Sequence, residues 1–335
     1  MNVWKLTAAN KIERFEEPVP AASEEKIKVR VTKVLLCSQD GALFRGQFKI
    51  KYPVVPGRFA VGIVAEDYSD DYPKGTRVLL HTYLPAEDSG SAKKDFSESD
   101  FDVCGQTRDG FLRDLVLLSP DEMTPLPDSV SDEDALLLHH VALAKAVVDS
   151  LEVKKGQHIA VVGASGLGII ICQLLIYQQA APILIDANQN RLNFANASGI
   201  YYTQNTEGNF LENVGVLTGG RLADGAVFVT DAKDVEPSVA FQVCAREANV
   251  VIGGFSSRGI NLDVGEAIRK QLTVHCLSEY VDNLEMAINL TANKAVNMQQ
   301  VKAKPVEPDT LTEFYSSYVT YAEEEEKDYI YIKML

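Results

Sequence analysis

The sequence has 335 residues, of which 46% are hydrophobic and 24% are charged, and this composition is typical of a globular protein with room for two domains. Lys and Arg total 32 against 47 Asp and Glu, which gives a formal net charge of −15. That charge repels nucleic acid and anionic membrane surfaces, so we expect no nucleic-acid partner and no membrane partner.

The beginning of the sequence has no long apolar run of the signal-peptide kind, and no stretch is long enough to span a bilayer. The five cysteines are scattered and never form a C-x-x-C pair. This usage suits a reducing compartment and argues against both a disulfide framework and a four-cysteine zinc lobe. We therefore expect a cytoplasmic protein.

The first third of the chain predicts β-structure. Apolar or alternating runs, separated by glycine and proline, predict strands at residues 26–37, 58–67, 74–84 and 110–120. Residues 86–105 are polar and acidic without periodicity, which predicts a surface loop or lobe. Residues 129–151 begin with serine and acidic residues and continue as an apolar run, which predicts one helix.

From residue 158 onward the predicted strands and helices alternate. Strands are expected at 158–164, 181–187, 225–232, 249–255 and 272–278, and helices at 166–180, 188–199 and 236–248. Continuous apolar strands between helices predict an α/β fold with a parallel sheet covered on both faces. The tail 328–335 alternates again and is expected to return to the β-rich region, after an acidic run at 322–328 that reads as a solvated helix end.

A glycine-rich turn, "VVGASGLG", separates the first of these strands from its helix. Gly163 is expected to make the tight turn, and Gly168 is expected to allow the helix to pack closely. Ser165 stands where the usual fingerprint has its middle glycine, and Gly166 and Leu167 follow it. The backbone amides near Ser165 to Leu167 would then face the pyrophosphate of a dinucleotide. By itself the turn is a weak signal, because glycine turns before helices are common.

An acidic residue strengthens this prediction. Asp186 ends the next apolar strand, where a carboxylate binds the adenosine ribose hydroxyls, and Arg191 follows at a position beside the ribose. A carboxylate at that place repels the 2′-phosphate of NADP, at a cost of about 1 to 4 kcal/mol. We therefore expect NAD in preference to NADP. The alternative is a structural turn and an Asp that caps the following helix.

The stretch "VVPGRFAVGIV" contains one arginine, Arg58, in an otherwise apolar segment. A guanidinium stays charged when it is buried and is costly there unless it is paired. The residue therefore calls for a specific partner or a specific function.

These segments resemble those of the medium-chain dehydrogenase/reductase family, in its zinc-type alcohol and polyol dehydrogenase branch. The resemblance rests on "VLLCSQDGALFRG", "YPVVPGRFAVGIV", "DGFLRDLVLL", "VVGASGLG…LIDANQNRL" and "VVIGGF", and it covers nearly the whole chain. It implies a β-rich catalytic domain like chaperonin-10, formed by residues 1–140 and 276–335, and a central Rossmann dinucleotide-binding domain formed by residues 141–275.

The resemblance also exposes a departure at the catalytic metal site. The family's three zinc ligands fall at Cys37, followed by Asp40, at Arg58 and near Leu138, so only the cysteine is retained. A catalytic zinc ion needs about three protein ligands, and a guanidinium repels the ion. His139 and His140 lie next to the third position and could supply one ligand, but the set would remain poor. The structural-zinc lobe corresponds to 86–105 and holds only Cys104, so we expect neither zinc ion and predict no metal site.

Arg58 then has two candidate roles. It could stabilise the negative charge on the substrate oxygen during hydride transfer or bind an anionic group of the substrate, and nearby Arg45, Lys49 and Lys51 favour an anion. Alternatively, it could form a structural ion pair with Asp40 in place of zinc.

The proton carrier is less well defined. His139 and His140 are the candidate acid/base residues, although a histidine on an apolar helix is more often a core residue. Tyr52 is a weaker candidate donor, and Ser38 is expected to point elsewhere on a strand. Without a metal, Cys37 is expected to be a buried thiol.

The sequence therefore predicts an NAD(H)-dependent oxidoreductase that interconverts an alcohol or polyol and a carbonyl without catalytic zinc, with a phosphorylated or carboxylated compound as the candidate substrate. One alternative is a polyol-phosphate or ribulose-phosphate reductase of the same family, and another is a nucleotide-binding sensor or scaffold with a decayed active site. The family's dimers join the edge strands of their Rossmann sheets, so we expect a homodimer or homotetramer, with 249–255 and 272–278 at that edge.

Overall fold

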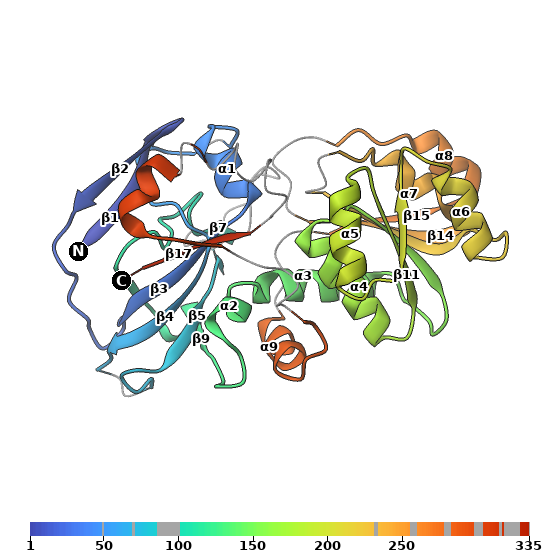
Figure 1. The fold of residues 1–335 in the computed structure, drawn as a ribbon. Helices are drawn as coiled ribbons and strands as arrows, with labels where there is room; N and C mark the ends of the chain where they lie inside the picture. The colour runs from blue at the N-terminus through green and yellow to red at the C-terminus, as the bar shows by residue number, and fades with distance from the viewer. Residues whose placement is uncertain are drawn as a thin grey trace, which may run out of the picture. The chain divides into compact units, whose positions relative to one another are not determined.

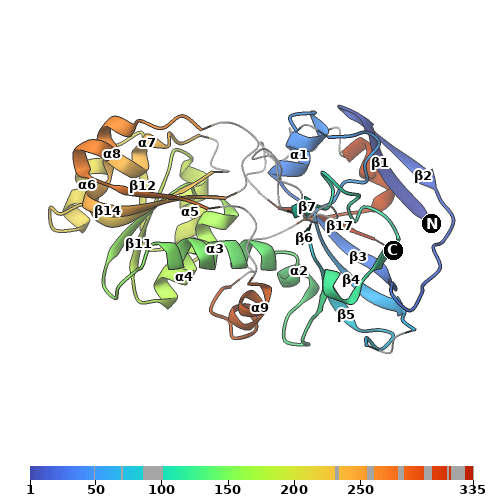
Figure 2. The ribbon, with the colours of Figure 1, turned by 180° about the vertical axis from the view of Figure 1, so that it is seen from behind.

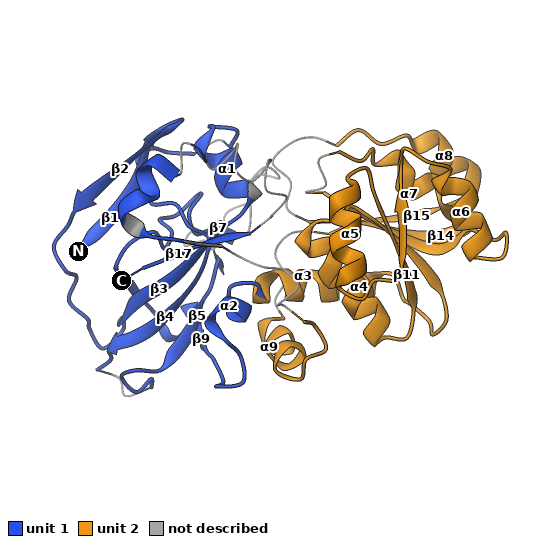
Figure 3. Cartoon of the chain, viewed as in Figure 1, with its two compact units in different colours: residues 1–137, 302–335 blue, residues 138–301 orange. Residues whose placement is uncertain are grey.

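The computed structural model describes residues 1–48, 50–68, 71–85, 101–230, 234–254, 260–277, 283–297, 304–314, 317 and 329–334. The chain divides into two compact units (Figure 3). Unit 1 comprises Met1–Leu137 and Lys302–Leu335, and unit 2 comprises Leu138–Val301.

Unit 1 is built mainly from β-strands (Figure 1). Its main sheet has the order β16-β17-β3-β4-β5-β9, with β8 also paired to β3, and every pairing except β16 with β17 is antiparallel. Its strands are β1 (Asn2–Ala8), β2 (Lys11–Glu16), β3 (Ile27–Leu36), β4 (Phe59–Glu66), β5 (Arg77–Leu80), β6 (Tyr83–Pro85), β7 (Phe101–Val103), β8 (Leu115–Leu118), β9 (Met123–Pro125), β16 (Lys304–Val306) and β17 (Ile330–Lys333). Its helical segments are α1 (Ser38–Phe44), η1 (Pro120–Glu122), α2 (Asp132–Ala135) and η3 (Pro308–Thr310).

Unit 2 is a parallel sheet with the strand order β12-β11-β10-β13-β14-β15. This order runs 3-2-1-4-5-6 along the chain of the unit, which is the doubly wound dinucleotide-binding topology. Its strands are β10 (His158–Val162), β11 (Ala181–Asp186), β12 (Tyr202–Asn205), β13 (Ala223–Val229), β14 (Cys244–Gly253) and β15 (Thr273–Cys276). Its helices are α3 (Leu138–Ser150), α4 (Gly166–Tyr177), α5 (Gln189–Ala197), α6 (Phe210–Leu217), α7 (Ser238–Gln242), α8 (Val264–Lys270) and α9 (Leu284–Ala292).

Both faces of the central strands of the sheet in unit 2 are buried. On one face, alternate residues of the central strands, such as Ala160 and Ile183, form a core with Phe241 of α7. The intervening residues of β10, Ile159 and Val161, are equally buried. Helices α3 and α4 pack side by side (Figure 2), and α4 also contacts β10 and β11. The expected α/β fold with a parallel sheet and a separate β-rich domain is confirmed.

The return of the chain to unit 1 comes later than residue 276. Helix α9 follows β15 and packs against α3, so it belongs to unit 2, and unit 1 resumes at Lys302. The first division, after Leu137, lies close to the expected residue 140.

Several expected local elements differ from the structure, and others lie outside the described residues. The predicted helix at 129–151 is two helices, α2 and α3, because α2 ends at a cap on Leu136. The strand expected through Cys37 ends at Leu36, and Ser38 begins α1 rather than extending a strand. The acidic run at 322–328 and most of the lobe at 86–105 lie outside the described residues, and the lobe's end, Phe101–Val103, forms β7 against β6.

The predicted helix at 236–248 is also too long, because α7 stops at Gln242 and β14 begins at Cys244. The ammonium group of Lys270 donates hydrogen bonds to the carbonyl oxygens of Phe241 at 3.0 Å, Gln242 at 2.7 Å and Cys244 at 2.8 Å. These carbonyls are the unsatisfied groups of a helix C-terminus, and the cation stabilises them there. The apolar pattern is compatible with either element, and this tertiary contact ends the helix.

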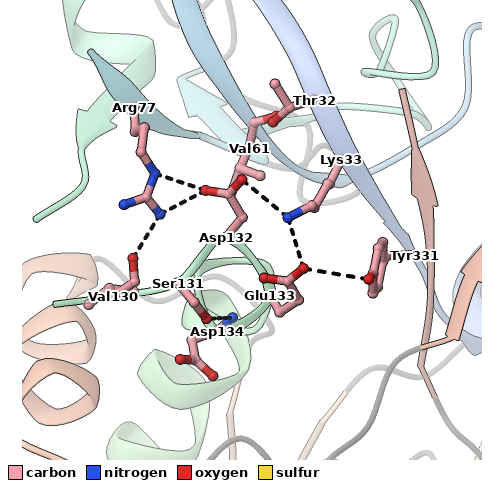
Figure 4. A network of polar contacts seen from close by, with 10 residues as sticks. All are labelled: Thr32, Lys33, Val61, Arg77, Val130, Ser131, Asp132, Glu133, Asp134 and Tyr331. Atoms are coloured by element: carbon pink, nitrogen blue, oxygen red, sulfur yellow. Dashed lines mark hydrogen bonds and ion pairs between the residues drawn. The ribbon is translucent and has the colours of Figure 1, made fainter. Parts of the chain in front are cut away.

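A charged network connects α2 to the sheet of unit 1 (Figure 4). Arg77 donates to Asp132 Oδ1 from Nε at 2.9 Å and from Nη2 at 2.7 Å, and Lys33 donates to Asp132 at 3.2 Å and Glu133 at 2.8 Å. Burial raises the pKa of Asp132, but the hydrogen bond from Arg77 and the charge of Lys33 outweigh it, so the pKa lies below its usual value. Tyr331 of β17 lies 3.5 Å from Glu133, which connects the C-terminal segment to the same network.

Candidate functional site

A tight glycine turn presents Arg58 at the start of β4. Gly57 has φ of +93°, and a Cβ atom added there would lie 2.8 Å from Val34 Cγ1. The Gly57 carbonyl accepts the amide of Phe111 at 2.9 Å, and a Cβ on Gly110 would come within 2.3 Å of that same oxygen. Only glycine fits at these two positions, so the backbone on which Arg58 stands is closely packed.

The Arg58 side chain is buried, with 2% of it exposed. Its Nη2 atom donates to Tyr83 Oη at 3.4 Å, and its guanidinium carbon lies 5.9 Å from the ring centres of both Phe59 and Tyr83. Thr82 donates its hydroxyl to the Arg58 carbonyl at 2.6 Å. A buried cation is therefore held against aromatic faces, which stabilises it electrostatically. Sequence reasoning missed Tyr83, because its strand meets Arg58 only in the tertiary structure.

Cys37 and Asp40 form a capping box at the N-terminus of α1. The Cys37 amide donates to Asp40 Oδ2 at 2.9 Å, and its thiol lies 3.3 Å from that oxygen and 2.7 Å from Gln39 Oε1. Burial, together with the charge of Asp40, raises the pKa of Cys37 well above its usual value. The thiol therefore stays protonated near neutral pH and is a poor nucleophile.

The proposed direct ion pair between Arg58 and Asp40 is not formed by these two described residues. Asp40 directs Oδ2 to the N-terminus of its own helix, and its buried Oδ1 accepts no hydrogen bond among the described residues. Burial raises the pKa of Asp40, and the charge of Arg58 partly offsets this rise. The two groups therefore interact through space rather than through a contact.

These side chains are a poor donor set for a zinc ion. The thiol of Cys37 is engaged with its own helix, Arg58 is a cation, and Leu138 is a buried aliphatic residue. Among the residues that the structure describes, no group of three His, Cys, Asp or Glu is placed to hold a metal. In the lobe, Cys104 is buried and its thiol donates to the His81 carbonyl at 3.6 Å.

His139 and His140 lie on α3 and are 7% and 1% exposed. They belong to unit 2, whereas Arg58, Cys37 and Asp40 belong to unit 1, and their catalytic role stays a prediction. Of the other basic candidates, Arg45 caps the C-terminus of α1 and Lys51 is exposed, while Lys49 lies outside the described residues. Tyr52 is 38% exposed.

The glycine-rich turn joins β10 to α4. Gly163 has φ of +114°, and a Cβ on Gly168 would lie 2.0 Å from the Gly163 carbonyl oxygen, so both positions require glycine. Ser165 caps α4 by accepting the Gly168 amide at 3.3 Å, and Gly166 and Leu167 form the first turn. The turn therefore directs a helix N-terminus toward the carboxyl edge of the sheet, where a phosphate is stabilised.

Asp186 is fully buried and stabilises this turn from the end of β11. Its Oδ2 accepts the Ala164 amide at 2.7 Å, and its Oδ1 accepts the Asn188 amide at 2.8 Å. Arg191 Nη1 lies 4.0 Å from Asp186 Oδ2 and 3.7 Å from Asp234 Oδ2. Contact of Asp186 with a ribose stays a prediction, and Asp234 is a neighbour that sequence reasoning missed.

Comparisons with known proteins agree with this two-part architecture. Residues 23–128 match the alcohol dehydrogenase GroES-like domain. An uncharacterized zinc-type alcohol dehydrogenase-like protein of Haemophilus influenzae is 22% identical over 93% of each chain. D-xylulose reductase A of Aspergillus oryzae is 25% identical over 88% of this chain and 87% of its own.

Solved structures give the same fold. 2R,3R-butanediol dehydrogenase from Bacillus subtilis is 19% identical, with a TM-score of 0.84 over 99% of each chain. Two others, each 18% identical with a TM-score of 0.83 over 99% of this chain, hold different coenzymes. An alcohol dehydrogenase from Escherichia coli CFT073 is matched over 99% of its own chain and holds NADH. A zinc-binding dehydrogenase from Sinorhizobium meliloti 1021 is matched over 98% of its own chain and holds NADP.

The fold and the glycine turn are those of a two-domain protein with a doubly wound dinucleotide-binding unit. The chain contains the alcohol dehydrogenase GroES-like domain and is similar along most of its length to alcohol and polyol dehydrogenases of the medium-chain dehydrogenase/reductase type, which supports an alcohol/polyol dehydrogenase-like oxidoreductase. None of the helices in the described part of the chain has the length and apolar character needed to cross a membrane.

Proposed function

We propose that this protein is an NAD(H)-dependent oxidoreductase that interconverts an alcohol or polyol and a carbonyl without catalytic zinc, using Arg58 in place of the metal. The observation that carries the proposal is the buried guanidinium of Arg58, which the Gly57 turn fixes at the position of a family zinc ligand. When bound, NAD(H) would supply or accept the hydride.

Arg58 acts on the substrate oxygen. Negative charge grows on that oxygen as the carbonyl is reduced, and a fixed cation in a dry site stabilises it strongly. Arg58 keeps its positive charge throughout, because a guanidinium does not release its proton in a protein. The proton must therefore come from another group, for which His139 and His140 are the candidates. Cys37 remains a neutral thiol and takes no covalent part.

The same guanidinium favours a substrate with an anionic group. A guanidinium can bind a carboxylate or phosphate through two parallel hydrogen bonds, which adds geometric selectivity. We therefore propose a phosphorylated or carboxylated polyol or sugar as the substrate class. The alternative activity of a polyol-phosphate reductase falls within this proposal.

Two carboxylates support NAD over NADP. Asp186 and Asp234 both lie within 4.0 Å of the Arg191 guanidinium, which would otherwise attract a 2′-phosphate. Arg191 is therefore already neutralised, and the remaining negative charge disfavours an additional phosphate.

The exposed edge of the sheet in unit 2 supports a homodimer or a homotetramer. Strand β15 is the edge strand, and its Val274 is 37% exposed. On the adjacent helix α8, Val264 and Ile268 are 60% and 74% exposed. An edge strand with exposed apolar neighbours favours pairing with a second copy. The five free cysteines are consistent with the cytoplasm as the place of action.

Kinetics of an Arg58→Met variant test the proposal. We expect kcat/KM with carbonyl substrates to fall by about 10²- to 10³-fold, the usual effect of losing one oxyanion donor. The Kd for NADH should be unchanged, and the matched control Arg246→Met, at a residue exposed on β14, should behave like the wild type. Metal analysis of the purified protein should find no stoichiometric zinc.

Two outcomes would contradict the proposal. One is a tightly held zinc ion whose removal abolishes turnover, and the other is unchanged kinetics in Arg58→Met. Binding of NADH without turnover of any alcohol, polyol or polyol phosphate would favour the sensor alternative instead.

A further inference from the structure

The strand order of unit 2 reverses between β10 and β13, so the carboxyl ends of these two strands face a crevice. In open α/β sheets, ligands bind at such a switch point. The glycine turn follows β10, and Thr230 follows β13 directly. Thr230 therefore stands opposite the turn on the other side of the switch point.

Three elements meet at the Thr230 side chain. Its amide donates to the Gly253 carbonyl of β14 at 3.0 Å. Gly254 has φ of +131°, and a Cβ added there would lie 2.7 Å from Thr230 Oγ1 and 3.5 Å from Leu167 Cδ2. The hydroxyl thus lies where the ends of β13 and β14 approach the first turn of α4, which is the turn that carries Leu167.

The hydroxyl of Thr230 is buried and forms no hydrogen bond within the described part of the chain. A buried hydroxyl without a partner destabilises a protein, whereas valine would fill nearly the same volume without that penalty. Packing alone therefore does not explain a threonine here. A buried polar group of this kind in a native structure calls for an explanation, and at the end of a strand beside the glycine turn a hydrogen bond supplied by a ligand is one.

We propose that Thr230 Oγ1 is a hydrogen-bonding partner of the nicotinamide half of the dinucleotide. This inference rests on the proposed function, because it requires NAD(H) as the coenzyme. The assignment to the nicotinamide half follows from the topology: Asp186 and Arg191 lie beyond β10 on the side of β11, whereas Thr230 ends the first strand of the second mononucleotide-binding half.

The test compares Thr230→Val with Thr230→Ser in the full-length protein. Titrations would follow the emission of NADH, with AMP binding measured by competition, and urea unfolding would be followed without coenzyme. We expect Thr230→Val to raise the Kd for NADH about five- to tenfold, the effect of one lost hydrogen bond, while its Kd for AMP and its stability are retained or improved. Thr230→Ser should bind NADH within about twofold of the wild type.

The outcomes separate this inference from the proposed function. If Thr230→Val binds NADH like the wild type and is more stable, the hydroxyl has no role toward the coenzyme and the inference is wrong. Equal weakening of NADH and AMP would also overturn it, since that pattern indicates a general distortion of the site. If the wild type itself binds neither NADH nor AMP, the proposed function is wrong, and this inference is overturned with it.

Discussion

The interaction between Arg58 and Asp40 gives a quantitative test of the charge arrangement in unit 1. The perturbation is a double-mutant cycle that combines Arg58→Met with Asp40→Asn. Asp40 is fully buried, and its Oδ2 accepts hydrogen bonds from the amide and the thiol of Cys37. Burial raises the pKa of Asp40, and the charge of Arg58 is among the interactions that partly offset this rise. Removing the guanidinium therefore leaves a buried carboxylate without its compensating charge.

The expected coupling energy follows from the geometry. The two groups are separated by more than an ion-pair contact. Two unit charges somewhat beyond contact distance interact by about 3 kcal/mol at an effective dielectric constant of about 20, and we expect a coupling energy of this order. The cycle cancels the loss of packing around each single substitution, which isolates this charge term.

The pH dependence has a definite sign. Burial raises the pKa of Asp40 in the folded protein above its unfolded value of about 4. The contribution of the protonated carboxyl to the free energy of unfolding is therefore fully present below about pH 4 and is lost as the pH rises through the folded pKa. Asp40→Asn should remove this decline. The coupling to Arg58 needs the ionised carboxylate, so it should be present at pH 7 and should shrink toward pH 4.

Urea unfolding followed by tryptophan emission provides the assay. The chain has one tryptophan, Trp4, which is 1% exposed in the core of unit 1, so its emission reports on the unit that carries both substitutions. Arg246→Met, which lies in unit 2, should leave the transition unchanged. A coupling energy near zero at pH 7, or one of equal size at pH 4, would refute the reasoning.

Two further predictions concern other charged groups. Asp132→Asn should lower the stability of unit 1 by about 1.5 to 3 kcal/mol at pH 7, because it loses charged hydrogen bonds from Arg77 and Lys33. The lowered pKa of Asp132 means that this penalty fades as the pH falls below about 4, which urea unfolding at pH 7 and pH 3 would check, and an equal penalty at both would contradict it. Asp234→Asn should shift the ratio of the Kd values for NADPH and NADH toward NADPH by up to about fivefold, because Arg191 loses an exposed neighbouring carboxylate. Fluorescence titrations with both coenzymes measure the ratio, and an unchanged ratio would exclude a role for Asp234.

Local patterns in the sequence were sufficient for much of the fold and for part of the site. Alternating apolar strands and helices predicted the parallel sheet, because burial on both faces imposes a continuous apolar strand pattern. The glycines of the coenzyme turn and Gly57 were visible for a similar reason, since a positive φ or a close backbone approach leaves few alternatives to glycine. Arg58 was conspicuous because a charge is rare in such an apolar segment.

The partners of these residues were decided by the tertiary structure. Tyr83 reaches Arg58 from a different strand, Asp234 reaches Arg191 from a segment beyond β13, and Thr230 meets Gly254 only because their strands are neighbours in the sheet. The early end of α7 depends likewise on a contact with Lys270, which is distant in sequence. The late return of the chain to unit 1 depends on the packing of α9 against the distant helix α3. The sequence by itself determined which backbone conformations and which layers form, because these depend on neighbouring residues. Only the tertiary structure decided which charges and hydroxyls meet, because long-range contacts leave no periodic pattern in the chain.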